Sequence, residues 1–184
     1  MNILLDARAK INLFLRVGPP RSDGYHEVFT LLQSITLADR IRIQCRPAAR
    51  RGKFKLSLSD RRIPADRRNT VHKAHRYLCE KFPAARDFDF DVRIHKHIPA
   101  GAGLGGGSAD AAGFLAGACE ALGLKLPAGR AALIDVATKI GADAAFCLRG
   151  GTAICRGRGD SAGRRTSSGQ PQHATIHDST PKWL

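Results

Sequence analysis

The sequence predicts one α+β domain, because strand-like segments come first and a mixture of helices and strands follows. Apolar and polar residues alternate over 10–17, 40–45 and 53–58 with the period of a half-buried strand. Segments with helical spacing or a high alanine content occupy 69–82, 108–122 and 127–140. With 184 residues the chain is long enough for one well-buried domain and a small appendage.

The first strand, 10–17, has its aliphatic residues at odd positions and Lys10 and Asn12 at even positions. We therefore expect the odd face to pack on the core, and Lys10 and Asn12 to point away from it. The segments 40–45 and 53–58 alternate cleanly, which suggests an antiparallel sheet with one face open to solvent.

Three helices and three shorter strands are predicted after residue 68. Asn69 is a suitable N-cap for the first helix, and the second runs from Ser108 to Gly123, a good residue to follow a helix end. The third spans 127–140, with Pro127 near its first turn. The stripe expected to bury the first helix is Val71, Ala74, Leu78 and Phe82. The strands are expected at 92–98, 144–148 and 152–155.

The most informative stretch is 99–109, Pro-Ala-Gly-Ala-Gly-Leu-Gly-Gly-Gly-Ser-Ala, between a predicted strand and a predicted helix. Its five glycines let the backbone turn sharply and bring N–H groups close to a ligand. The helix that follows adds unpaired N–H groups and the positive end of its dipole. Such a loop favours phosphate, so the sequence predicts a nucleotide-handling protein. A glycine-rich hairpin turn is the simpler alternative, although a tight turn needs only one or two glycines.

Several phosphate-loop templates compete for this stretch. Gly101, Gly103 and Gly106 satisfy the dinucleotide fingerprint, but the acidic residue expected after it, Glu120, falls inside a predicted helix. The sequence has no Gly-Lys-Ser/Thr for a Walker loop, and no His-Arg-Asp or Asp-Phe-Gly of a protein kinase. The pattern Pro-x-x-x-Gly-Leu-Gly-x-x-Ser-Ala is met in full.

This last pattern resembles the phosphate loop of the GHMP small-molecule kinases. Ala-Lys-Ile-Asn-Leu-Phe-Leu at 9–15, Asp-Gly-Tyr-His at 23–26 and Gly-Ala-Asp at 141–143 resemble other motifs of the family, in the same order. The resemblance covers residues 1–159 and implies the N-terminal GHMP kinase domain, with a ribosomal protein S5 domain 2-like fold. Whole members of the family carry a second, C-terminal GHMP domain, which is missing from this sequence.

The resemblance narrows to the member that uses ATP and Mg²⁺ to phosphorylate the 2-hydroxyl of a cytidine-diphosphate-linked methylerythritol, an isoprenoid precursor. It implies that Asp143 is the catalytic base and that Lys10 stabilises charge beside it. It places Asn12, Tyr25 and His26 at the substrate, and Ser108 at a phosphate or Mg²⁺. The residues that would bind ATP are Pro99, Ala100, Gly101, Ala102, Gly103, Leu104, Gly105, Gly106, Gly107, Ser108 and Ala109.

Each of these roles has a plainer alternative. In the plainer interpretation Ser108 only caps its helix, Asp143 is a turn aspartate between a helix and a strand, and Lys10 is a solvated strand lysine. Tyr25 and His26 could form an ordinary loop. Two alanines follow Asp143, whereas the family commonly has Val-Pro after this aspartate. The remaining candidates are Asn69, which weakly resembles an adenine-site residue, and His95 and His97, read as sheet-face histidines without a third metal ligand.

Composition limits the other function classes. The formal charge of +14 favours a nucleic-acid partner, but the arginines are dispersed along the sequence and aromatic residues are only 6%. A basic nucleic-acid-binding module on the same fold, another GHMP kinase acting on homoserine or mevalonate, and an inactive fragment therefore stay as alternatives. We expect no membrane span, no signal peptide and five reduced cysteines, as in a cytoplasmic protein.

The composition changes after Gly159. Residues 160–184 are mostly small, polar and basic, with Ile176 as the only aliphatic residue larger than alanine before the last few positions. Such a segment buries too little apolar surface to order itself, so we expect a disordered or aberrant tail. A regulatory tail is the alternative.

Overall fold

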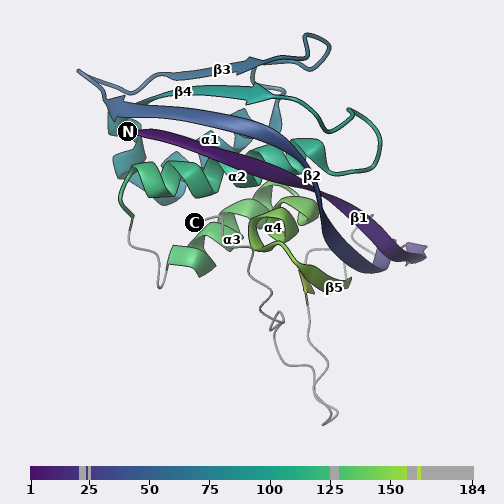
Figure 1. Ribbon diagram of the computed structural model, residues 1–184. Coiled ribbons are helices and arrows are strands. Elements are labelled where there is room, and N and C mark those ends of the chain that lie inside the picture. Colours follow the sequence, from purple (N-terminus) through teal and green to yellow (C-terminus); the bar gives the residue numbers. More distant parts are fainter. Residues whose placement is uncertain (21–23, 25, 125–128, 157–160, 163–184) are drawn as a thin grey trace.

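The computed structural model describes residues 1–20, 24, 26–124, 129–156 and 161–162 (Figure 1). Its strands are β1 (Asn2–Pro20), β2 (His26–Pro47), β3 (Phe54–Leu58), β4 (Phe88–His95), β5 (Thr152–Arg156) and β6 (Ser161–Ala162). Its helices are α1 (Thr70–Lys81), α2 (Gly106–Ala121), α3 (Gly129–Ile140) and α4 (Ala142–Arg149), with a 3-10 turn η1 (Pro83–Asp87). The α+β class is confirmed.

The strands form one sheet in the order β3-β4-β2-β5-β6, with β1 paired to β2. The helices lie below one face of it, and the other face carries no helix in the described part of the chain (Figure 1). β2, which contains 40–45, pairs antiparallel with β1, β4 and β5, in line with the antiparallel sheet expected for that segment, but β3 runs parallel to β4. The antiparallel expectation for 53–58 was wrong because α1 and η1 connect β3 to β4, and a helical crossover joins parallel strands.

The predicted alternation of core-facing and solvent-facing residues along β1 is interrupted within the strand. The register with β2 shifts between Arg8 and Lys10, where Ala9 alone lies opposite 35–37 of β2, so the simple alternation of the two faces breaks at this point. Lys10 is therefore buried, whereas Leu13, Leu15 and Val17 are more than half exposed. The expectation that Lys10 points away from the core was wrong, because an irregularity in the pairing with β2 interrupts the period-2 alternation directly before it.

The helices pack on the sheet largely as their sequence patterns predict. Asn69 caps α1 by accepting a hydrogen bond from the Val71 N–H at 3.0 Å, and Val71, Ala74 and Leu78 are fully buried. α2 crosses β1 and β2 closely at two glycines. A Cβ added at Gly117 would lie 2.6 Å from Ile43 Cδ1 and 2.9 Å from Leu5 Cδ2.

We expect Gly117→Ala to destabilise the fold by about 1–3 kcal/mol, since the added methyl overpacks the contact between α2 and the sheet. Helix propensity alone would instead stabilise the variant by about 1 kcal/mol. Urea unfolding followed by circular dichroism measures the difference in the free energy of unfolding. A stabilised variant would contradict the close approach seen at this position.

A cluster of aromatic rings fills the space between α1, β3, β4 and α2. The His75 ring stacks on Phe54 at 4.3 Å between centroids, and it meets Phe90 and Phe114 edge-on at 5.7 and 6.1 Å. Burial, aided by the nearby His72, lowers the pKa of His75 to about 4. The imidazole is therefore neutral in the folded protein at neutral pH.

Stability should fall in mild acid because of His75. Its pKa is lower in the folded state than in the unfolded chain, so unfolding takes up a proton between about pH 6.5 and 4, and the penalty grows as the pH falls. We expect the wild type to lose about 2 kcal/mol more than His75→Phe between pH 7 and pH 5. Urea melts at both pH values test this, and equal losses in the two proteins would contradict it.

Two expectations concern the end of the chain and membranes. Ser161 and Ala162 form β6 against β5, within the stretch expected to have no structure, while 163–184 lie outside the described residues. In the part of the chain that the structure describes, no helix has the length and apolar character needed to cross a membrane. The five cysteines all lie in the described residues, and none of them forms a disulfide there.

Candidate active site

The glycine-rich segment after β4 forms an open loop that ends on the N-terminus of α2. Gly101, Gly103 and Gly105 have φ angles of +75°, +73° and +72°, which side chains rarely adopt. Gly105 occupies the N-cap position, so Ser108 lies in the first turn of α2. The reading of Ser108 as the cap is wrong. Gly105 takes the left-handed cap position instead, so α2 begins at Gly106, two residues before the predicted start.

Lys10 holds this loop against β1. Its backbone N–H donates to the Leu104 carbonyl at 3.0 Å, and its side chain runs directly beneath Gly105. A Cβ at Gly105 would lie 3.0 Å from Lys10 Cγ and 3.2 Å from Cε, so only glycine leaves room for the lysine stem. Both the conformation and the space at Gly105 thus require glycine.

The Lys10 ammonium lies between two side chains expected at the active site. Its Nζ donates to Asn12 Oδ1 at 2.8 Å and is 3.4 Å from Asp143 Oδ2. The Lys10 side chain is 8% exposed and that of Asp143 is 39% exposed, so the carboxylate faces outward from a buried cation. Asn12 is fixed in turn, since its Nδ2 donates to Thr30 Oγ1 at 2.8 Å.

Asp143 lies in the first turn of α4, not before a strand. The strand expected at 144–148 was wrong: short apolar runs do not distinguish strands from helices, and the two alanines after Asp143 suit a helix. An acidic residue in a first turn is stabilised by the helix dipole. The structure thus brings Lys10 and Asn12 of β1, Asp143 of α4 and the glycine loop together from three separate segments.

Of the other expected substrate residues, the one that the structure describes, His26, lies far from this group. Tyr25 is outside the described residues. His26 begins β2, where it pairs with Pro20 and its Nδ1 is 2.9 Å from the Gly18 carbonyl oxygen. Since Lys10 pairs with Ser34, His26 is up to roughly 25 Å away along the hairpin.

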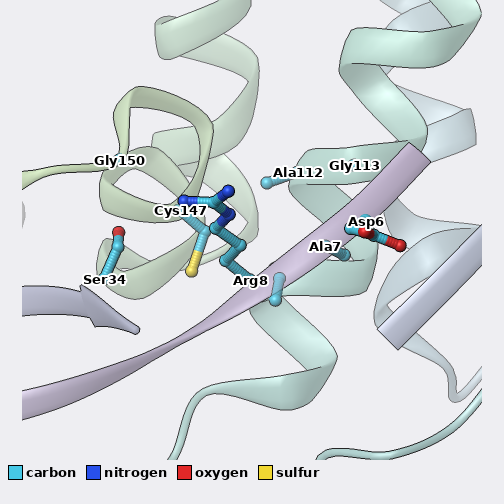
Figure 2. Close-up of a pocket in the computed structure, with 9 residues that line it drawn as sticks. Asp6, Ala7, Arg8, Ser34, Ala112, Gly113, Cys147 and Gly150 are labelled. Atoms are coloured by element: carbon cyan, nitrogen blue, oxygen red, sulfur yellow. The ribbon is translucent and has the colours of Figure 1, made fainter. Parts of the chain in front are cut away.

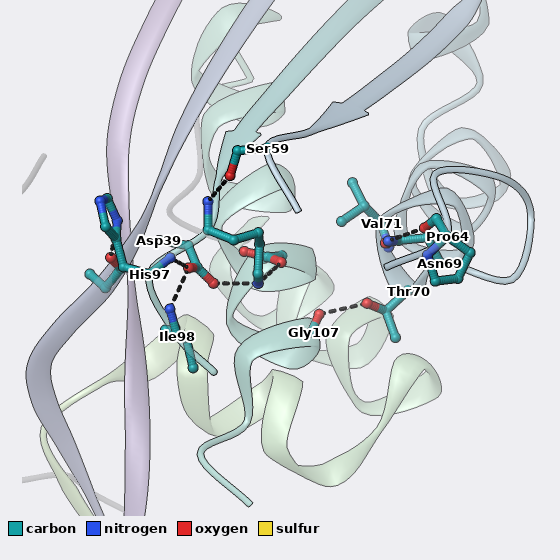
Figure 3. A network of polar contacts seen from close by, with 12 residues as sticks. Asp39, Ser59, Pro64, Asn69, Thr70, Val71, His97, Ile98 and Gly107 are labelled. Carbon is teal, nitrogen blue, oxygen red and sulfur yellow. Dashed lines mark hydrogen bonds and ion pairs between the residues drawn. The ribbon is translucent and has the colours of Figure 1, made fainter. Parts of the chain in front are cut away.

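A buried charge cluster that our sequence reasoning missed fixes both ends of the loop (Figure 3). Lys96 Nζ forms ion pairs with Asp39, on β2, and with Asp110, on α2, at 2.6 Å for the latter. Asp39 Oδ1 also accepts the backbone N–H groups of His97 and Ile98, at 2.6 and 2.8 Å. One lysine therefore ties the strand before the loop to the helix after it. In the sequence, the only sign of this cluster was that charged residues occur inside segments of high apolar content.

The two carboxylates of this cluster differ in how well their charge is stabilised. Burial alone would lower the pKa of Lys96, but the two carboxylates raise it overall, so the ammonium keeps its charge. Burial raises the pKa of Asp110 to about 7 despite the attraction of Lys96. Asp110 Oδ1 has no hydrogen-bond partner, whereas Asp39 uses both oxygens. Asp39 is therefore the better satisfied anion of the two.

The first turn of α1 supports the loop from the other side. The Thr70 hydroxyl donates to the Gly107 carbonyl at 2.6 Å (Figure 3). Asn69 is buried, and besides capping α1 its Nδ2 donates to the Pro64 carbonyl at 2.8 Å. Both polar ends of the Asn69 side chain thus have structural partners.

A small cavity lies behind β1, between α2 and α4, and its lining includes Arg8, Ser34 and Cys147 (Figure 2). Its volume of about 10 Å³ has room for one water molecule at most, so it is not a substrate site. Burial, with the charge of Asp143 nearby, raises the pKa of the Cys147 thiol to about 12. Cys147 therefore stays protonated, which makes it a poor nucleophile.

The described residues contain no group of three or more His, Cys, Asp or Glu side chains placed to hold a metal ion. The rings of His95 and His97 are 4.7 Å apart, and both side chains are exposed. His95 lies on the sheet as expected, but β4 ends there, so the placement of His97 on the same strand was wrong. Mg²⁺ prefers oxygen ligands and is commonly held by one or two protein groups together with substrate phosphates. The Ser108 hydroxyl and the Asp143 carboxylate are donors of that type.

Known proteins match both the sequence and the fold. The family of GHMP kinases N terminal domains matches residues 69–151. A protein of Synechococcus sp. (strain JA-3-3Ab) named 4-diphosphocytidyl-2-C-methyl-D-erythritol kinase is 43% identical over 156 residues, which are 85% of this chain and 48% of that protein. A Bacillus velezensis protein of the same name is 41% identical over 87% of this chain and 53% of its own length. The chain thus spans about half the length of these relatives.

Solved structures agree with this relationship. A crystal structure of 4-(cytidine 5'-diphospho)-2C-methyl-D-erythritol kinase has a TM-score of 0.66 and 34% identity, over 88% of this chain and 54% of the other. Homoserine kinase from Cytophaga hutchinsonii shares the fold, with a TM-score of 0.62 and 21% identity over 85% of this chain and 49% of that one. The glycine loop, the lysine beneath it and these matches together show that the chain carries the N-terminal domain of the GHMP kinase family.

Proposed function

We propose that this chain contributes the phosphoryl-transfer site of an ATP-dependent kinase that phosphorylates the 2-hydroxyl of 4-diphosphocytidyl-2-C-methyl-D-erythritol. The observation that carries the proposal is the Lys10–Asp143 pair, 3.4 Å apart and directly beside the glycine loop. The names of the relatives at about 40% identity support this acceptor over homoserine and mevalonate.

The glycine loop, Asp143 and Lys10 would each have a separate role in the reaction. The loop from Gly101 to Ser108 would hold the phosphates of ATP through backbone N–H groups at the start of α2. The Asp143 carboxylate would accept the proton of the substrate hydroxyl, whose oxygen then attacks the γ-phosphorus as ADP leaves. Lys10 would stabilise the negative charge that develops there. Mg²⁺, when bound with ATP near Ser108, supplies further charge neutralisation.

The acceptor would lie along the β1–β2 hairpin. Asn12 is held by Lys10 and Thr30 and would orient the hydroxyl end of the substrate. Tyr25 and His26 would contact the cytosine, by ring stacking and by hydrogen bonding. Five free thiols support a reducing compartment such as the cytoplasm.

ATP turnover with three acceptors tests the proposal. We expect the chain to produce ADP with 4-diphosphocytidyl-2-C-methyl-D-erythritol, and not above background with homoserine or mevalonate. Equal turnover with one of the other two would contradict the acceptor. Absence of turnover in a folded chain that binds ATP would show that these residues bind nucleotide without completing catalysis.

A further inference from the structure

A broad groove runs along α1, between that helix and the segments 51–54 and 85–88. Its volume is about 740 Å³. At one end it reaches Thr70, whose hydroxyl bonds to Gly107 beside the phosphate loop, and from there it follows the helix away from the loop. The groove is therefore separate from the group formed by Lys10, Asn12 and Asp143.

Positive charge dominates the groove. Among the described residues that line it, one is acidic, Glu80, and it lies 3.9 Å from Arg76. Asp66 holds another of the cations, Arg68, at 2.7 Å. The basic residues of the lining are Arg51, Arg67, Arg68, Lys73, Arg76 and Arg86. They come from three stretches of the sequence, and the fold gathers them on one side of the molecule.

Flat rings lie among these cations. Phe54, His72, His75 and Phe88 also line the groove, and each of the four is only partly buried. Phe54 and His75 stack on each other at an interplanar angle of 22°, and both residues keep part of their surface exposed beside the arginines. A basic groove with ring surfaces is the combination that binds single strands, with phosphates on the cations and bases against the rings.

The groove is longer than one nucleotide needs, and its wall is fixed. α1 has 12 residues and therefore extends about 18 Å. The Gly52 N–H donates to the Arg86 carbonyl at 2.8 Å, and a Cβ at Gly52 would lie 2.1 Å from the Phe88 carbonyl oxygen. The wall that carries Arg51 and Arg86 is thus pinned against β4 and preformed.

We propose that this groove binds single-stranded nucleic acid. The site uses none of the residues proposed to hold phosphate or to act in phosphoryl transfer. It shares one weaker candidate, Asn69, whose side chain is already bonded to Pro64 and Val71. The net charge of +14 would increase the rate at which a polyanion reaches it.

Fluorescence anisotropy of a labelled ten-nucleotide oligouridylate, titrated with the full 184-residue chain at 50–200 mM salt, tests this. The groove variant is Arg51→Gln/Arg67→Gln/Arg86→Gln. The matched control, Arg42→Gln/Arg46→Gln/Arg93→Gln, removes the same charge from the open face of the sheet. Thermal melts verify that both variants fold, and ATP binding is measured in parallel.

We expect the groove variant to lose at least about tenfold in affinity at 50 mM salt and to reduce the slope of log K against log salt by about 2. The sheet-face variant should change affinity less than about threefold, and both variants should still bind ATP. Equal losses in the two variants, or no binding by the wild type, would overturn the proposal. Loss of ATP binding together with the oligonucleotide would also overturn it, since the groove would then not be a separate site.

Discussion

Asp143→Asn should reduce the rate of phosphoryl transfer by about 10²–10⁴-fold, the range expected when a positioned general base is removed. The amide keeps the size of the side chain and its place in the first turn of α4 but cannot accept the proton. Because the side chain is 39% exposed, the free energy of unfolding should change little. Steady-state kinetics and a urea melt of the same preparation measure both effects.

The ion pair between Asp143 and Lys10 allows the two residues to be tested together. Lys10→Met should also lower kcat, and the double variant should lose far less than the product of the two single losses, since the residues act as a unit. Lys55→Met is the matched control, because Lys55 pairs with Asp91 at 3.7 Å on an exposed strand. Fully multiplicative losses would mean that the 3.4 Å pair has no joint role in catalysis.

Asp39→Ala should destabilise the protein by about 3–5 kcal/mol, the largest effect on stability that we expect from one substitution. It leaves the buried Lys96 ammonium with only Asp110, and it removes the acceptor of the His97 and Ile98 N–H groups. Urea unfolding measures the loss. Asp6→Ala is the control, since its pair with Arg40 is exposed and should contribute less than about 1 kcal/mol.

The same variant separates a structural role of the cluster from a functional one. Lys96 joins the strand before the glycine loop to the helix after it, so a loosened cluster should weaken ATP binding even where the protein is still folded. Binding of ATP at low temperature, with the folded fraction measured by circular dichroism, tests this. Unchanged binding together with the large loss of stability would limit the cluster to a structural role.

Local residue patterns were enough to predict much of this protein. The spacing of Val71, Ala74 and Leu78 predicted α1 and its buried face, and Asn69 predicted its cap, because both depend only on neighbours in the chain. The glycine loop was predicted as well, since positive φ angles and close packing both require glycine. The strand predicted at 144–148 was wrong, because a five-residue apolar run fits either a strand or a helix.

The sequence by itself determined the glycine loop, the residue types beside it and the helices that carry their own periodicity, because these depend on backbone geometry and local contacts. Only the tertiary structure decided that the alternation of β1 is interrupted before Lys10, that Lys96 lies between two buried carboxylates, and that dispersed arginines line one groove. The physical reason is the same in each case. Register shifts and charge pairing depend on segments that are distant in the sequence, and no local pattern records which of them will meet.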